Sequence, residues 1–163
     1  MEANRQETIK QDYQYCEEII KHHSKSFYYA FSQLPKAKAQ AIFAIYAFCR
    51  KADDSVDLID TKEEQLLAVA NLEKELSLFE QGNPIDHPIW RALTDVFERY
   101  NMSIEPFYDQ LIGQKMDINF AEPKGLSELE IYSYYVAGSV GLMLLPVLAS
   151  KSQQDLTQLA INL

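Results

Sequence analysis

The sequence has little glycine, proline or cysteine. Five Gly and six Pro in 163 residues argue against an all-β protein and favour long helices, since these two residues punctuate short strands and turns. Cys16 and Cys49 are the only cysteines. Two isolated cysteines form neither a disulfide framework nor a zinc site, so we expect a reduced, cytoplasmic protein.

Basic blocks and long hydrophobic runs are also missing. The net charge of −9, with no basic block to offset it, excludes non-specific binding to nucleic acid. The first twenty residues are polar and lack the apolar region of a signal peptide. The longest apolar stretch, residues 136–149, contains Pro146 and is shorter than the roughly 20 residues that span a bilayer. It predicts a buried core helix, while peripheral membrane contact stays open for an oily substrate.

Across almost the whole sequence, apolar residues recur at the spacing of a helix. Apolar residues make up 47% of it and charged residues 24%, the balance of a folded domain. Pro35 is placed to begin a helix that runs to about Asp57. Thr61 and Glu64 form a capping box, and Ser103 and Ser127 are further capping candidates. Without repeats or linkers, the chain reads as a single all-α unit over residues 1–163.

The last residues, "SQQDLTQLAINL", begin another amphipathic helix that carries Leu156, Leu159 and Leu163. The sequence stops inside this pattern, with no C-cap or polar tail. We therefore expect the chain to be the N-terminal part of something longer.

An acidic cluster occupies "CRKADDSVDLID", residues 49–60. At 100° per residue, one helical stripe roughly 60° wide contains four polar residues. These are Tyr46, Arg50, Asp53 and Asp57. The stripe flanks an apolar face, which favours a polar-lined cavity, and two carboxylates one turn apart can jointly hold Mg²⁺ beside a diphosphate. A solvated acidic turn at a helix end is an equally good interpretation of this spacing alone.

Two further segments carry candidate binding groups. "HHSKSF" gathers His23, Ser24 and Ser26, donors that suit phosphate oxygens, although an interhelical turn with Ser as N-cap explains them equally simply. "YSYYVAGSVG" places Gly138 and Gly141 three residues apart. Small residues on one helix face admit an apolar ligand or, more ordinarily, a second helix, at a cost near 1 kcal/mol per Gly.

Taken together, "HSKSF", "AIYAFCRKADDSVD", "MDINF" and "YVAGSVG" resemble the squalene and phytoene synthase family. Their order and separations look most like the bacterial dehydrosqualene or phytoene synthases, from about residue 13 onward. The resemblance implies an all-α isoprenoid-synthase fold around a long hydrophobic cavity. It also implies Mg²⁺-dependent, head-to-head condensation of two prenyl diphosphates, farnesyl or geranylgeranyl, to dehydrosqualene, squalene or phytoene in carotenoid and isoprenoid biosynthesis.

The resemblance assigns roles residue by residue. Asp53 and Asp57 would bind Mg²⁺ and diphosphate, and Tyr132 would lie near the reacting carbons. The residues around the diphosphate would be His23, Ser24, Ser26, Tyr46 and Arg50. The lining of the tunnel for the prenyl chains would be Phe27, Val136, Ala137, Val140, Gly141 and Leu144.

One departure from the family pattern matters. The family carries a second aspartate-rich motif on a helix that faces the first, and this sequence stops about where that helix begins. We therefore expect the chain by itself to be inactive, and to self-associate through an apolar face left uncovered.

Two other classes of function compete with the synthase. A non-catalytic assembly protein of the same fold would usually have lost Asp53 and Asp57, and both are present. A helical bundle with a di-metal carboxylate site needs Glu-x-x-His pairs, and the sequence has none placed for it.

Overall fold

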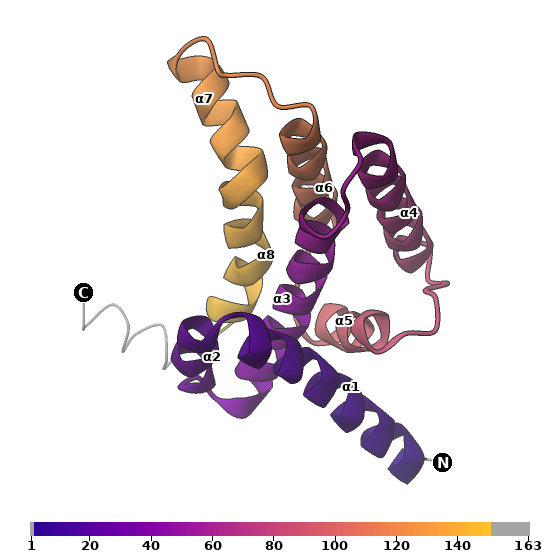
Figure 1. Cartoon of the computed structure of the whole chain (residues 1–163). Helices are drawn as coiled ribbons and strands as arrows, with labels where there is room; N and C mark the ends of the chain where they lie inside the picture. Colours follow the sequence, from indigo (N-terminus) through magenta and orange to yellow (C-terminus); the bar gives the residue numbers. More distant parts are fainter. Residues whose placement is uncertain (1, 151–163) are drawn as a thin grey trace, which may run out of the picture.

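The computed structural model describes residues 2–150, and these residues form helices without any strand. The expected all-α fold is confirmed (Figure 1). The helices are, in order, α1 (Glu2–His23), α2 (Lys25–Ser32), α3 (Lys36–Asp57), α4 (Lys62–Glu80), α5 (Pro88–Arg99), α6 (Glu105–Ile118), α7 (Leu126–Ser133), the π-helical turn η1 (Tyr134–Gly138) and α8 (Ser139–Leu148). The amphipathic segment predicted over residues 152–163 lies outside the described residues.

Helix starts follow local capping chemistry at two of the four predicted places. Helix α3 begins directly after Pro35, and Thr61 caps α4 by accepting a hydrogen bond from the Glu64 backbone N–H at 3.2 Å. The caps predicted at Ser103 and Ser127 are wrong, because α6 follows Ile104, α7 follows Gly125, and neither start has a side-chain cap. At α7 the Glu128 carboxylate accepts the Lys124 backbone N–H at 2.8 Å, which ties the preceding loop to the first turn of the helix.

The core lies around α3, which packs against α1, α4, α5, α6 and α8. Figure 1 shows α3 and α6 between α8 on one side and α4 on the other. Phe48 on α3 is fully buried, with its ring 5.9 Å from that of Trp90 and 5.1 Å from that of Phe107. Edge-to-face aromatic pairs of this kind add about 0.5–1.5 kcal/mol beyond the area they bury. This aromatic centre fixes α3, and with it the acidic cluster, against α5 and α6.

The last three elements run as one helix of 23 residues, Leu126–Leu148, long and apolar enough to cross a membrane by length and composition. The prediction of a buried core helix is wrong here, because only 17% of its most apolar 18-residue stretch is buried. The buried side chains of α8 are Ser139, Met143 and Val147. In the part of the chain that the structure describes, α8 packs mainly on α3 and α6, which cover one narrow stripe of the helix.

A close backbone approach joins α6 to η1. A Cβ on Gly113 would lie 2.6 Å from the carbonyl oxygen of Tyr135, so only glycine fits this position. The helix contact predicted at Gly138 and Gly141 does not occur within residues 2–150. A Cβ on Gly141 would meet nothing within 4 Å, and one on Gly138 would meet only the Tyr134 ring of its own helix. The small-residue face therefore points away from the packed helices.

Candidate active site

Asp53 lies on the side of α3 that faces α6. Its side chain is half-buried, and the Gln114 side-chain amide donates a hydrogen bond from Nε2 to Asp53 Oδ1 at 2.7 Å. Burial raises the pKa of the Asp53 carboxyl, while the hydrogen bond from Gln114 and the charge of Arg50 act to lower it. Asp53 is therefore a held carboxylate at a helix interface, and the interpretation as a purely solvated acidic turn does not fit it.

Asp57 lies one turn further along α3, in a more open setting. Its side chain is 61% exposed and accepts a hydrogen bond from Arg50 at 3.1 Å. Arg50 also donates from Nε to Asp54 at 2.9 Å, so one guanidinium holds two carboxylates. Tyr46, one turn before Arg50, is half-buried, and burial raises the pKa of its phenol. The predicted stripe exists, with Asp54 as an additional member that binds Arg50.

The aspartate pair fits a hard divalent cation. Mg²⁺ prefers oxygen ligands, keeps several waters and takes one or two carboxylates together with phosphate oxygens. Within residues 2–150, no group of three or more His, Cys, Asp or Glu side chains is arranged to hold a metal ion. Asp53 and Asp57 are the two carboxylates of this stripe that would hold such a cation, with water and phosphate oxygens as its other ligands.

A pocket of about 340 Å³ brings His23 and Arg50 together between α1, α3 and α5. Its lining is Tyr15, Ile19, His23, Ala47, Arg50, Lys51, Asp54, His87 and Ile89. Two of these side chains are cationic, and both already pair with carboxylates: Arg50 with Asp54 and Asp57, and Lys51 with Glu75. Binding of an anion here stays a prediction for His23 and Arg50. Lys51 and His87 are members that the sequence did not predict.

The "HSKSF" segment forms the junction of α1 and α2. Ser24 is the N-cap of α2, and its Oγ accepts a hydrogen bond from the Phe27 backbone N–H at 3.3 Å. Ser26 is exposed, and Phe27 is 54% exposed. The interhelical turn with a serine cap is therefore present. The structure places His23 at the same junction, without a direct contact from these serines to Asp53 or Asp57.

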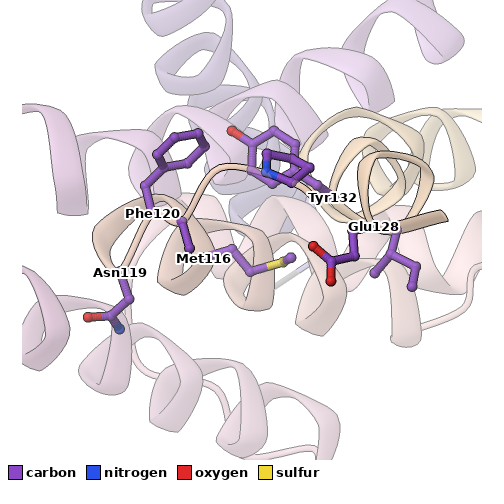
Figure 2. Close-up of a pocket in the computed structure, with 8 residues that line it drawn as sticks. Met116, Asn119, Phe120, Glu128 and Tyr132 are labelled. Atoms are coloured by element: carbon purple, nitrogen blue, oxygen red, sulfur yellow. The ribbon is translucent and has the colours of Figure 1, made fainter. Parts of the chain in front are cut away.

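Tyr132 lies at the start of the long final helix. Its hydroxyl donates to Asp117 Oδ1 on α6 at 2.6 Å, and this hydrogen bond, with some burial, raises the pKa of the Tyr132 phenol. Asp117 is three residues after Gln114, so α6 links Tyr132 to Asp53 over less than one turn. Figure 2 shows Tyr132, Phe120 and Met116 around a mainly apolar pocket of about 240 Å³ at the connection of α6 and α7.

Of the residues predicted to line a tunnel, Phe27 lies exposed on α2 and the other five lie on the helix Leu126–Leu148, in two groups. Val140 and Leu144 pack partly against the core, next to the contact of Cys49 Sγ with Met143 Sδ at 3.7 Å. The others are exposed on the outward face of the helix: Val136, Ala137 and Gly141. The structure thus packs two of the six predicted residues against the core and leaves four open to solvent.

Sequence reasoning missed Gln114, Asp54 and His87 as neighbours of this site. A signal for Gln114 was available, because Gln110, Gln114 and Asp117 recur at helical spacing among apolar residues. Polar groups on a face that must pack against another helix need partners, and Gln114 and Asp117 find them in Asp53 on α3 and Tyr132 on α7.

Comparisons with known proteins show the family of the chain. A family model for squalene/phytoene synthase matches residues 20–163. A phytoene synthase of Arthrospira platensis is 37% identical over 150 residues, which are 92% of this chain and 48% of that protein. A 4,4'-diapophytoene synthase of Staphylococcus haemolyticus is 34% identical over 152 residues, 91% of this chain and 52% of that protein. The chain spans about half the length of these curated relatives.

Solved structures show the same fold. A crystal structure of a dehydrosqualene synthase in complex with ligand superposes with a TM-score of 0.79 at 50% identity, over 85% of this chain and 48% of that one. A squalene synthase from Alicyclobacillus acidocaldarius superposes with a TM-score of 0.79 at 23% identity, over 90% of this chain and 54% of that one. At that lower identity, the second likeness supports the fold alone.

Proposed function

This chain belongs to the squalene/phytoene synthase family, and we propose that it carries the aspartate pair of a Mg²⁺-dependent prenyltransferase. The proposed reaction is head-to-head condensation of two farnesyl or geranylgeranyl diphosphates to dehydrosqualene, squalene or phytoene, in carotenoid and isoprenoid biosynthesis. The observation that carries the proposal is the setting of Asp53, a carboxylate held at a helix interface one turn from Asp57 and beside Arg50.

The side chains divide the work of binding a diphosphate. Asp53 and Asp57 present carboxylate oxygens on one side of α3, and Mg²⁺, when bound there, supplies charge neutralisation for the leaving diphosphate. Arg50 offers a planar guanidinium that matches phosphate oxygens in a bidentate way. When Arg50 binds a phosphate group, its guanidinium moves away from Asp57. The Asp57 carboxylate then becomes available as a ligand of Mg²⁺.

The apolar groups hold the prenyl chains. We assign the outward face of the final helix, with Ala137 and Gly141 as its smallest residues, to contact with these chains. Tyr132 and Phe120, whose ring centroids are 5.9 Å apart, present aromatic faces near the N-terminal part of this helix. An aromatic face stabilises a desolvated cation by roughly 2 kcal/mol, which suits an allylic cation formed by ionisation.

The location we propose follows from the chemistry of the substrates. Prenyl diphosphates carry oily tails, and the hydrocarbon product is insoluble in water. A cytoplasmic protein with peripheral membrane contact suits both. We expect no binding of nucleic acid, because the chain is acidic. A non-catalytic assembly protein of the same family remains a weaker alternative, because both aspartates are present.

Binding of a prenyl diphosphate tests this function directly. We expect the chain to bind a non-hydrolysable farnesyl diphosphate analogue only when Mg²⁺ is present, as measured by isothermal titration calorimetry. The replacement Asp53→Asn should weaken this binding at least tenfold. Replacing even a group that only hydrogen-bonds to a metal ligand typically lowers metal affinity about 10–100-fold.

Asp60→Asn is the matched control, since Asp60 is an exposed carboxylate just beyond the same helix. It should leave the affinity unchanged. Binding of equal strength with and without Mg²⁺, or equal losses in the two variants, would contradict the proposed function.

A further inference from the structure

We propose that Gln114 is a positioning residue that fixes the Asp53 carboxylate for a cation–diphosphate ligand. This inference rests on the proposed function. The geometry is the hydrogen bond from Gln114 Nε2 to Asp53 Oδ1 at 2.7 Å, between α6 and α3 and across 61 positions of sequence. The bond engages one carboxylate oxygen and leaves Oδ2 to meet a ligand from the open side of α3.

Gln114 is itself held firmly enough to act in this way. Gln114 is 9% exposed, and Phe107 and Leu111 on the same helix are each only 1% exposed. Next to it, Gly113 lets the α6 backbone lie directly against the Tyr135 carbonyl of η1. Helix α6 is thus packed on both sides, and a side chain on a fixed helix presents its amide at a fixed place.

The amide suits the task because of its chemistry. An amide N–H donates at any pH and carries no charge that would compete for a cation. The same hydrogen bond favours the charged form of Asp53, against the burial that raises the pKa of this carboxyl. A lysine would repel Mg²⁺, and a glutamate would share or compete for it. Glutamine orients the carboxylate without either effect.

A merely structural role is the alternative, in which Gln114 only ties α6 to α3. The two roles differ in one readout. A structural tie predicts a loss of thermal stability with no change in ligand affinity beyond that of any comparable core variant. A positioning role predicts a loss of affinity that an equally buried neighbouring glutamine does not share.

The test uses the chain with Mn²⁺ as the spectroscopic probe and inorganic diphosphate as its partner. Free Mn²⁺ is followed by electron paramagnetic resonance, and folding by circular dichroism. Gln114→Met keeps the length of the side chain and removes the donor. We expect it to weaken Mn²⁺–diphosphate binding about 10–100-fold, the range seen for groups that orient metal ligands.

Gln110→Met is the matched control, because Gln110 lies one turn earlier on α6, is 4% exposed and is not bonded to Asp53. It should keep the affinity of the unaltered chain. If Gln114→Met proves unfolded, Gln114→Leu also removes the donor without adding a charge and should weaken binding in the same way.

Two outcomes separate the failure of this inference from that of the proposed function. If Asp53→Asn abolishes Mn²⁺–diphosphate binding while folded variants of Gln114 bind as Gln110→Met does, Gln114 is only structural and this inference is overturned. If Asp53→Asn binds like the unaltered chain, the aspartate pair is no metal site and the proposed function falls with it.

Discussion

At the scale of single residues, the guanidinium of Arg50 is bound by two carboxylates. Asp54 holds Arg50 through Nε at 2.9 Å, and Asp57 holds it at 3.1 Å. Asp54 is therefore a partner of the guanidinium, in spite of its place inside the D-D-x-x-D motif. Asp54 and Asp57 thus share one guanidinium, while Asp53 is bound by Gln114.

We expect Asp54→Asn to weaken prenyl diphosphate binding by no more than about fivefold, since partly exposed ion pairs contribute up to about 1 kcal/mol. Calorimetry with Mg²⁺, side by side with Asp53→Asn, measures the difference. A loss in Asp54→Asn as large as that in Asp53→Asn would place Asp54 among the metal ligands.

His87 makes the stability of α5 sensitive to pH. Its Nδ1 accepts the Ile89 backbone N–H at 3.1 Å as the N-cap, and burial, together with the charge of Lys51, lowers the pKa of the imidazole. The folded state thus binds this proton less readily than the unfolded state. Stability is full above the unfolded value near pH 6.5 and declines as the pH falls below it.

Urea denaturation from pH 8 to pH 5 measures this decline. The variant His87→Asn keeps a capping side chain without titrating, so its curve should be flatter over the same range, while His87→Ala should lose about 1 kcal/mol at neutral pH. A parallel decline in His87→Asn would show that other groups cause the pH dependence.

The sequence predicted part of the site at this scale. Asp53, Asp57, Arg50 and Tyr46 share a stripe because helix geometry alone places them there. The partners of these residues were not predictable in the same way. Gln114 reaches Asp53 from another helix, and nothing local in either segment specifies that meeting.

At the scale of elements, Gly113 decides how closely α6 approaches the final helix. Gly113→Ala would place a methyl group 2.6 Å from the Tyr135 carbonyl oxygen, and the two backbones would have to separate. We expect a loss of roughly 1–3 kcal/mol in the free energy of unfolding, the usual cost of overpacking.

Gly141→Ala is the control on the neighbouring helix, where a Cβ meets nothing within 4 Å. It should be neutral or stabilising by up to about 1 kcal/mol, through helix propensity. Equal stability of the two variants in urea denaturation would mean that α6 and η1 do not approach as described.

Local rules predicted the starts of two helices and failed at two others, where Ser103 and Ser127 do not cap. Pro35 and the Thr61 cap mark helix starts through their own backbone chemistry, and both predictions are confirmed. The short helix α2 and the π-helical turn η1 were not predicted. A π turn is a local widening of a regular helix, and the apolar pattern of residues 126–149 has no feature that distinguishes it.

At the scale of the whole molecule, an apolar helix face lies uncovered in the described part of the chain. Leu142 is 44% exposed and Leu145 is 55% exposed on this face. Exposed apolar patches of this kind usually mark an interaction surface. Hydropathy predicted a buried helix because it measures composition, whereas burial depends on which elements lie alongside.

We expect the 163-residue chain to self-associate through this face with rising concentration, as measured by analytical ultracentrifugation. The double replacement Leu142→Glu with Leu145→Glu should leave it monomeric, with stability changed by no more than about 0.5 kcal/mol because the sites are on the surface. Leu58→Glu, at a 73% exposed leucine on the α3–α4 connection, is the control. Unchanged association in the double variant would exclude this face.

Turnover is the remaining prediction at this scale. With one aspartate pair, Asp53 and Asp57, as its proposed metal ligands, we expect the chain alone to release no hydrocarbon from farnesyl or geranylgeranyl diphosphate. Gas chromatography of reactions with Mg²⁺ measures the product. Formation of dehydrosqualene or phytoene at an ordinary enzyme rate would contradict this expectation.

The order of the core residues along the chain has a consequence for biosynthesis. Apart from Met143 and Val147, every buried apolar residue of the core within residues 2–150 precedes position 112. During translation, the aromatic nucleus around Trp90 can therefore begin to pack before the apolar helix Leu126–Leu148 leaves the exit tunnel of the ribosome.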